Sequence, residues 1–218
     1  MPASAPPASP LPALRPLRRD ELPADAVGLA RYLLDKVLVH DLPEGRLAGR
    51  IVETEAYPVG DPASYAYRGR TRANGAMFLA PGHAHVRLLY GLSWTLNISA
   101  EAEGIGAGIL VRALEPLAGL EAMRQRRPAA RPLDLARGPG RLGAAMAIGP
   151  GLDCVDLCTG AGLWLADRAT AAGDCGTVGV ARRIGLSRAA DLPLRFFVAD
   201  NPYVSGPRAA LREAQGQA

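Results

Sequence analysis

The chain has 218 residues, 49% hydrophobic and 21% charged, which is enough for one sizeable core and excludes a disordered or fibrous protein. Three cysteines are too few for a disulfide scaffold. The formal net charge of +4 is compatible with a nucleic-acid partner but does not establish one.

The N-terminal segment 1–19 is rich in proline and alanine and predicts a disordered leader. It lacks the positive start and apolar stretch of a secretory signal, and the chain has no run of about 18 apolar residues that would predict a membrane-spanning helix. We therefore expect a cytoplasmic protein. A single domain is expected over 20–208, followed by a tail over 209–218.

Hydrophobic spacing and turn signals outline the domain. Asp25 is expected to cap a helix that runs to Asp35, and strands are expected over 36–40 and 46–57. Further elements are predicted as strands over 83–90, 94–99 and 108–114, helices over 117–127 and 142–148, and strands over 163–166, 177–184 and 194–198. Because regular alternation of strands and helices is missing, the sequence predicts one α+β domain with a mixed or antiparallel sheet.

Two carboxylates stand on the strand over 46–57. In strict alternation Ile51, Glu53, Glu55 and Tyr57 share one face of this strand. Two acidic side chains and a tyrosine are unusual for a core face, so the pattern indicates either a solvated face or a site. In a site, a carboxylate at a strand end can act as general base for a water molecule.

The loop over 58–82 is long for a compact domain, and such loops are often functional. It carries Arg68, Arg70 and Arg72, while Arg141 follows a glycine-proline turn further along the chain. We interpret each arginine either as a phosphate contact or as an ordinary solvated side chain.

His83 and His85 alternate along a strand, which is one arrangement that ligates metals. No third ligand stands at a convincing spacing, since His40, Cys154 and Cys158 are remote in the sequence. We therefore interpret both histidines as ordinary hydrogen-bonding residues and predict no metal site.

Tyr90 stands beside the tip of a hairpin formed by the strands over 83–90 and 94–99. It is either a wedge that enters a base stack or an aromatic ring packed on its own sheet. Arg112 stands inside an apolar strand and needs a partner, for which Glu53, Glu55 and a phosphate are the candidates.

A set of short motifs follows the chain in order. They are VETEAY at 52–57, DPAS at 61–64, MF at 77–78, PG at 81–82, LYG at 89–91, NIS at 97–99, RALEP at 112–116, GP at 138–139, LRFFV at 194–198 and PYVS at 202–205. Together they closely resemble the alkyladenine (3-methyladenine) DNA glycosylase family. The resemblance extends over most of the chain, from VETEAY and the helix before it to PYVS.

This resemblance implies a single mixed α/β domain with a curved, largely antiparallel sheet and a protruding β-hairpin. It implies a monofunctional DNA glycosylase of base excision repair, which hydrolyses the N-glycosidic bond of a damaged purine flipped out of duplex DNA. It also implies that no metal or organic cofactor is needed. We expect a monomer that acts on double-stranded DNA containing alkylated or deaminated bases, associated with the bacterial nucleoid and not with a membrane.

The resemblance implies roles for individual residues. Glu55 matches the general base that activates water, and Arg112 matches the arginine that supports this water and a nearby phosphate. Tyr57 matches one aromatic wall of the base pocket. Asn97 matches the residue that disfavours the amino group of normal guanine, and Tyr90 matches the tyrosine that fills the gap in the duplex.

Two pocket positions depart from the family pattern. Tyr65 stands where the family usually has histidine, and Arg87 stands where it usually has an aromatic residue. A positive charge beside a cationic purine is unfavourable, so we hypothesise a rebuilt pocket in which neutral lesions become better substrates relative to 3-methyladenine. The alternative is an altered register that moves Tyr67 or His85 into the pocket.

Two other classes of function stay open. One is a non-catalytic protein of the same fold that senses distorted DNA through Tyr90, although the presence of both Glu55 and Arg112 argues against it. The other is a metal-dependent hydrolase that uses His83 and His85, which would be sensitive to chelators.

Overall fold

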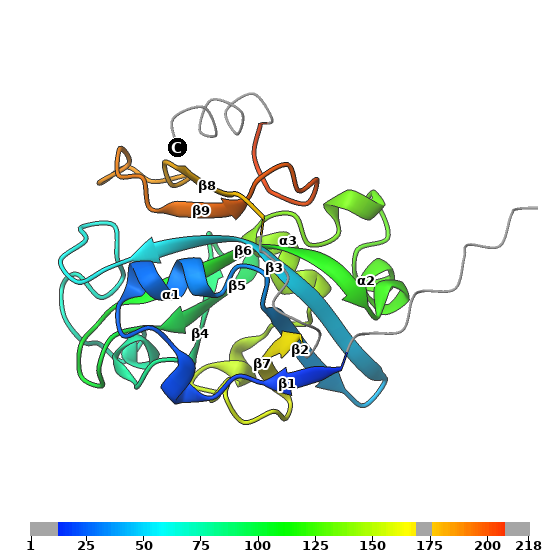
Figure 1. The fold of residues 1–218 in the computed structure, drawn as a ribbon, viewed down its shortest axis with the longest axis horizontal. Coiled ribbons are helices and arrows are strands. Elements are labelled where there is room, and N and C mark those ends of the chain that lie inside the picture. The colour runs from blue at the N-terminus through cyan, green and yellow to red at the C-terminus, as the bar shows by residue number, and fades with distance from the viewer. Residues whose placement is uncertain (1–12, 169–175, 208–218) are drawn as a thin grey trace, which may run out of the picture.

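The computed structural model describes residues 13–168 and 176–207, which form an α+β domain with one open, antiparallel, nine-stranded sheet (Figure 1). The strands are β1 (Leu14–Pro16), β2 (Val37–Leu42), β3 (Gly45–Tyr57), β4 (Ala84–Leu89), β5 (Ser93–Ser99), β6 (Gly108–Ala118), β7 (Leu163–Arg168), β8 (Val178–Ala181) and β9 (Arg195–Val198). The helices are α1 (Ala26–Tyr32), α2 (Leu120–Arg126) and α3 (Pro139–Ala145), with 3-10 turns at Arg19–Glu21, Gly75–Phe78, Pro132–Asp134 and Pro150–Leu152. The predicted fold class is confirmed.

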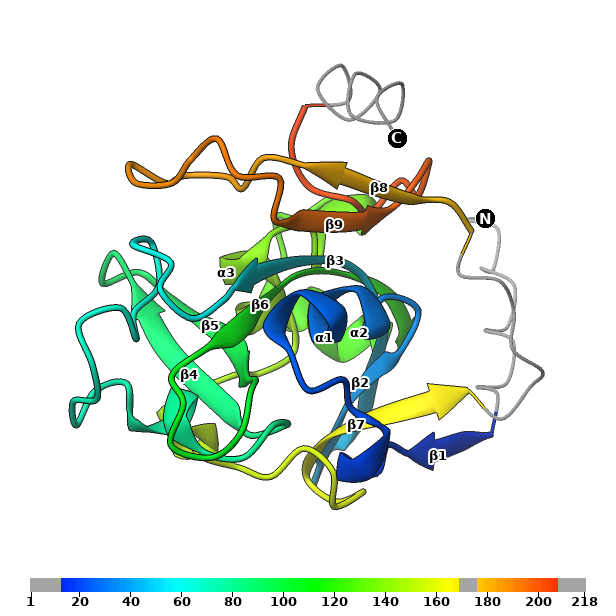
Figure 2. The same cartoon turned by 60° about the vertical axis from the view of Figure 1, so that its left-hand side comes forward.

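The long strand β3 organises the sheet. Its first half pairs with β2 and its second half pairs with β9, while β6 pairs along the other edge. Beyond these neighbours the sheet continues through β7 and β1, through β5 and β4, and through β8. Because β2 and β9 leave one edge of β3 at different points, the sheet is strongly curved, as Figures 1 and 2 show.

Bulges in β3 change which side chains are buried. The register against β6 shifts between Ile51 and Glu53 and again between Glu53 and Thr54. Ile51 and Val52 are both fully buried in the core, so the strict alternation predicted for this strand is interrupted. Glu53 and Glu55 are fully buried as well. The interpretation of this face as solvated is therefore wrong.

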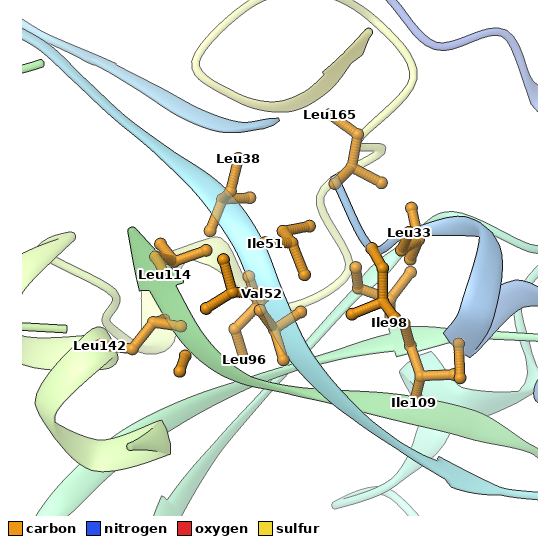
Figure 3. Close-up of a cluster of buried hydrophobic side chains, with 14 of the residues drawn as sticks. Leu33, Leu38, Ile51, Val52, Leu96, Ile98, Ile109, Leu114, Leu142 and Leu165 are labelled. Carbon is orange, nitrogen blue, oxygen red and sulfur yellow. The ribbon is translucent and has the colours of Figure 1, made fainter. Parts of the chain in front are cut away.

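One continuous cluster of buried aliphatic side chains joins the sheet to its helices (Figure 3). The helix α1 packs on β3 and β6, and α3 packs on β5 and β6. Figure 3 shows Leu33 near the end of α1 and Leu142 of α3 at opposite sides of this cluster. Burial of each large aliphatic side chain contributes about 1.5–3 kcal/mol, so the cluster fixes the strands that carry the acidic residues.

Close packing of α3 against β5 depends on a glycine. A Cβ atom on Gly143 would lie 1.9 Å from the carbonyl oxygen of Trp94. The predicted turn into this helix is confirmed, but the helix begins at Pro139 rather than at 142. Proline is favoured at a first helical position because its fixed φ suits the helix and its missing N–H is not needed there.

Other boundaries differ from the predictions for local reasons. Asp25 caps α1 by accepting the Gly28 N–H at 2.7 Å, as predicted. The helix ends before Asp35, because Asp35 adopts a φ of 72° and donates its N–H to the Ile51 carbonyl at 2.9 Å. The strand β6 continues to Ala118, so α2 begins at Leu120 rather than at 117.

Part of the range assigned to the leader has regular structure. Leu14–Pro16 pairs with β7 and Leu17 is fully buried, so the structure starts earlier than the predicted residue 20. A three-residue strand that ends in proline has no periodicity to detect. Residues 1–12 of the predicted leader and the predicted tail over 209–218 lie outside the described residues.

The β4–β5 hairpin forms as predicted. Tyr90 and Gly91 both have positive φ, 51° and 69°, which suits the tight turns that match the twist of paired strands. Tyr90 is 79% exposed and the nearby Leu92 is 85% exposed. The alternative in which Tyr90 packs on its own sheet is therefore wrong.

Candidate active site

Arg112 of β6 binds both buried carboxylates of β3. Its Nε is 3.0 Å from Oε1 of Glu53, and its Nη1 is 3.1 Å from Oε1 of Glu55. Burial alone would lower the pKa of Arg112, but the two carboxylates outweigh burial and raise this pKa, so the guanidinium stays charged. The prediction that Arg112 pairs with an acidic residue is confirmed, and it pairs with both glutamates.

Glu53 is enclosed by protein donors. Its Oε1 accepts hydrogen bonds from Arg112, from Arg195 Nη1 at 3.0 Å and from the Ser205 hydroxyl at 3.0 Å. Its Oε2 accepts the Ser205 N–H at 2.7 Å. These donors come from β6, β9 and the segment after β9, so Glu53 ties distant parts of the chain together.

Glu55 has a less complete set of donors. Its Oε1 accepts the Ile184 N–H at 2.8 Å and forms the ion pair with Arg112. Its Oε2 accepts only the Tyr57 hydroxyl, at 2.9 Å, within the described part of the chain. A carboxylate oxygen can accept two hydrogen bonds, so Oε2 keeps a lone pair for a water molecule.

Tyr57 is held between Glu55 and a second arginine. The guanidinium carbon of Arg183 lies 4.6 Å from the Tyr57 ring centroid, and Arg183 forms a fully buried ion pair with Asp61. Arg183 also donates to the Ala56 carbonyl at 3.0 Å. Burial raises the pKa of Tyr57, and the nearby Glu55 carboxylate raises it further, so the phenol keeps its proton and donates to Glu55.

A pocket of about 240 Å³ opens beside this cluster. Its lining includes Tyr57, Tyr65, Met77, Leu89, Tyr90, Thr95, Asn97, Gly108, Leu110, Arg112, Pro139, Ile184, Gly185 and Leu186. Tyr57 and Arg112 belong both to the lining and to the carboxylate cluster, so the Glu55 carboxylate lies directly behind the wall. The exposed Tyr90 stands at the mouth of the pocket.

Tyr65 separates Arg87 from this pocket. The Arg87 guanidinium stacks on the Tyr65 ring, 3.4 Å from its centroid, and Arg87 lines a neighbouring hollow instead of the pocket. Neither Tyr67 nor His85 lines the pocket, so the altered register is not observed. The aromatic surface that Arg87 does not provide is supplied by Tyr65 from the loop after β3.

Comparison with known proteins identifies the family. A family model described as "Methylpurine-DNA glycosylase (MPG)" matches residues 20–202, which is most of the chain. The chain belongs to this family. It is therefore a hydrolase, a DNA glycosylase of base excision repair.

Three similar glycosylase sequences carry the name "Putative 3-methyladenine DNA glycosylase". A protein of Paraburkholderia phytofirmans is 59% identical over 203 residues, covering 93% of this chain and 94% of the relative. One of Mesorhizobium japonicum is 53% identical, covering 88% and 91%. One of Methanoculleus marisnigri is 43% identical, covering 83% and 94%.

The loop after β8 is a part of this glycosylase's pocket that sequence reasoning missed. A strand was expected to reach Ile184, but β8 ends at Ala181 and the chain turns over the end of β3, as Figure 1 shows in orange above cyan. Ile184 and its two successors line the pocket, anchored by Arg183. The one signal in the sequence was Arg183, an arginine beside apolar residues, which indicates a buried charged group in the same way as Arg112 does.

The predicted phosphate contacts of the glycosylase differ in their surroundings. Arg68, Arg70 and Arg72 are exposed and form no ion pair with the described residues. Arg141 instead lies 3.2 Å from the Asp134 carboxylate.

No helix in the described part of the chain is long and apolar enough to span a bilayer.

His83, just before β4, and His85, within β4, have ordinary partners. Nδ1 of His83 lies 2.8 Å from the Ala80 carbonyl oxygen, and Nδ1 of His85 lies 3.4 Å from the Asp153 carboxylate. No group of three or more His, Cys, Asp or Glu side chains suited to a metal ion occurs among residues 13–168 and 176–207.

We expect His85 to make stability fall at acidic pH. Burial lowers the pKa of His85 from its usual 6.5, and Asp153 only partly opposes this. Below about pH 6.5 the unfolded chain therefore binds a proton that the folded chain does not, so unfolding becomes easier as the pH falls through this window. In denaturant titrations between pH 7 and 5, the free energy of unfolding should fall less steeply with pH in His85→Gln than in the parent. Equal decreases in the two proteins would contradict the assignment.

Proposed function

We propose that this protein is a monofunctional glycosylase that hydrolyses the N-glycosidic bond of damaged purines flipped out of duplex DNA. The observation that carries the proposal is a pocket with aromatic walls, an exposed tyrosine at its mouth and a buried Arg112–Glu55 pair behind its wall. The names of the relatives support alkylated purines as the substrate class. Duplex DNA as substrate implies work in the cytoplasm at the bacterial nucleoid, and we propose a monomer.

The proposed reaction uses the flipped nucleotide, a water molecule and Glu55. The base enters the pocket against Tyr57 and Tyr65, while Asn97 disfavours the amino group of guanine. Arg112 holds the water beside Glu55, whose free Oε2 lone pair accepts its proton as the water oxygen attacks the sugar C1′. The N-glycosidic bond breaks and the base leaves with the bonding electrons, as a neutral molecule if the lesion was cationic and as an anion that takes a proton from solvent if the lesion was neutral. The carboxylate faces the positive charge that develops on the sugar.

An excision assay tests this function against its alternatives. Duplexes that carry single lesions are incubated with the protein, with and without a chelator, and abasic sites are detected by alkaline cleavage. The proposal expects excision that resists the chelator. Tight binding without excision would indicate a DNA-damage-binding protein, and loss of excision with the chelator would indicate a metal-dependent hydrolase.

We expect Tyr90 to act as the wedge. Tyr90→Ala should weaken binding of a lesion duplex by about 10- to 100-fold, because stacking on one base is worth about 1–3 kcal/mol. Tyr90→Phe should keep most of the affinity. The matched control is Leu92→Ala at the same exposed tip. Fluorescence anisotropy measures the dissociation constants, and equal losses in Tyr90→Ala and Leu92→Ala would rule out a specific wedge.

We expect the pocket to prefer neutral lesions. The Arg87 charge lies behind Tyr65, and a unit charge roughly 10 Å from a cationic base disfavours that base by on the order of 1–2 kcal/mol at an effective dielectric constant of about 20. Single-turnover rates for hypoxanthine and ethenoadenine, each divided by the rate for 3-methyladenine, should therefore fall about tenfold in Arg87→Gln. Leu88→Ala on the same strand is the uncharged control, and strong parental preference for 3-methyladenine or 7-methylguanine would refute the idea.

A further inference from the structure

A second hollow, of about 280 Å³, shares the Tyr65 side chain with the base pocket. Arg68 and Arg188 line it from the loops after β3 and β8, and Arg87 lines it from β4. No aspartate or glutamate belongs to its lining in the described structure. The hollow is therefore a concentration of positive charge directly beside the proposed base pocket.

The three arginines of this hollow differ from most arginines of the protein. Elsewhere in the described chain most arginines pair with carboxylates; the pairs include Arg46 with Asp41, Arg50 with Asp35 and Arg195 with Glu53. Arg68, Arg87 and Arg188 form no such pair within residues 13–168 and 176–207. Among these same residues the Nε atom of Arg87 also has no hydrogen-bond partner, although it is buried. An unpaired buried donor is costly, and the guanidinium that carries it lines the hollow, so an anion bound in the hollow would lie beside this unpaired group.

We propose that this hollow binds a phosphodiester group of the damaged strand, next to the flipped nucleotide; the proposal rests on the proposed function. The forked guanidinium matches phosphate oxygens in pairs, and a strand whose base enters the pocket must pass its backbone close to the pocket mouth. One phosphodiester carries a single negative charge, so three arginines leave the hollow net positive. The expected bias against cationic bases therefore persists when the strand is bound.

The salt dependence of DNA binding tests this site. Each phosphate contact contributes about 0.9 to the slope of log affinity against log salt concentration. The combined variant with Arg68→Gln and Arg188→Gln should have a slope shallower by about this amount, and both changes are at exposed positions that tolerate substitution. Arg31→Gln is the control, because Arg31 is exposed, has no carboxylate partner among the described residues and lines neither hollow. A slope equal to that of the parent would overturn the proposal.

Neutral backbone linkages distinguish a strand phosphate from free phosphate. Single methylphosphonates are placed in turn around the lesion. At one position this linkage should weaken DNA binding by the parent, and at that position it should not further lower the affinity of the double variant. If no position has this effect while inorganic phosphate displaces DNA more strongly than potassium chloride of equal ionic strength, the hollow holds free phosphate and the strand assignment is wrong. Excision by the parent is measured alongside: excision without these effects refutes this site alone, whereas no excision of any lesion refutes the proposed function.

Discussion

Glu55→Gln is expected to lower the single-turnover excision rate by about 10²- to 10⁴-fold, the usual contribution of a general base. The amide is nearly the same shape as the carboxylate but cannot take a proton from water. Arg112 keeps Glu53 as its partner at 3.0 Å, so the fold and the pocket wall should survive. Rates are measured with protein in excess over a duplex that carries one lesion.

Binding of the same duplex separates catalysis from assembly in this variant. Since the wedge and the pocket lining are untouched, Glu55→Gln should bind lesion DNA within a few-fold of the parent. Substantial excision by Glu55→Gln would assign the base to another residue. Loss of binding together with excision would mean that Glu55 builds the pocket without taking part in the chemistry.

Local patterns predicted the parts of the site that lie within single elements. Alternation predicted the strand that carries Glu53 and Glu55, and the hairpin signal placed Tyr90 beside the tip, although it did not decide whether the ring is exposed. Burial of the two carboxylates could not be predicted in this way, because it depends on a bulge and on donors that arrive from elsewhere in the chain. The arginine inside an apolar strand was the one local sign that a charged interior existed.

The rest of the site depends on contacts between distant segments. Ile184 donates to Glu55 across 129 residues of sequence, and Ser205 reaches Glu53 across 152. No periodicity connects such positions. Arg87 illustrates the same limit: the family resemblance placed it at a pocket wall, but a tyrosine from a loop lies in front of it. A side chain's position in its own strand does not reveal what packs over it.

Glu53→Gln is expected to destabilise the fold by about 3–5 kcal/mol, the usual cost of removing one partner of a buried ion pair. Glu53 is the carboxylate that neutralises Arg195, whose side chain is 5% exposed and otherwise contacts carbonyl oxygens and an aromatic ring in the described structure. A neutral amide leaves that guanidinium buried without a counter-charge. Chemical denaturation monitored by intrinsic fluorescence gives the free energy of unfolding.

Two controls make this loss specific to a buried charge. Glu121→Gln removes a carboxylate that is 75% exposed and 3.7 Å from Arg124, and should change stability by less than about 1 kcal/mol. Glu55→Gln should cost less than Glu53→Gln, because Arg112 retains its other partner. The two neighbouring glutamates are thus expected to give opposite results, one losing stability and the other losing catalysis. If Glu53→Gln kept its stability and lost excision instead, the roles of the two carboxylates would be exchanged, and the general base would be the residue with the fuller set of donors.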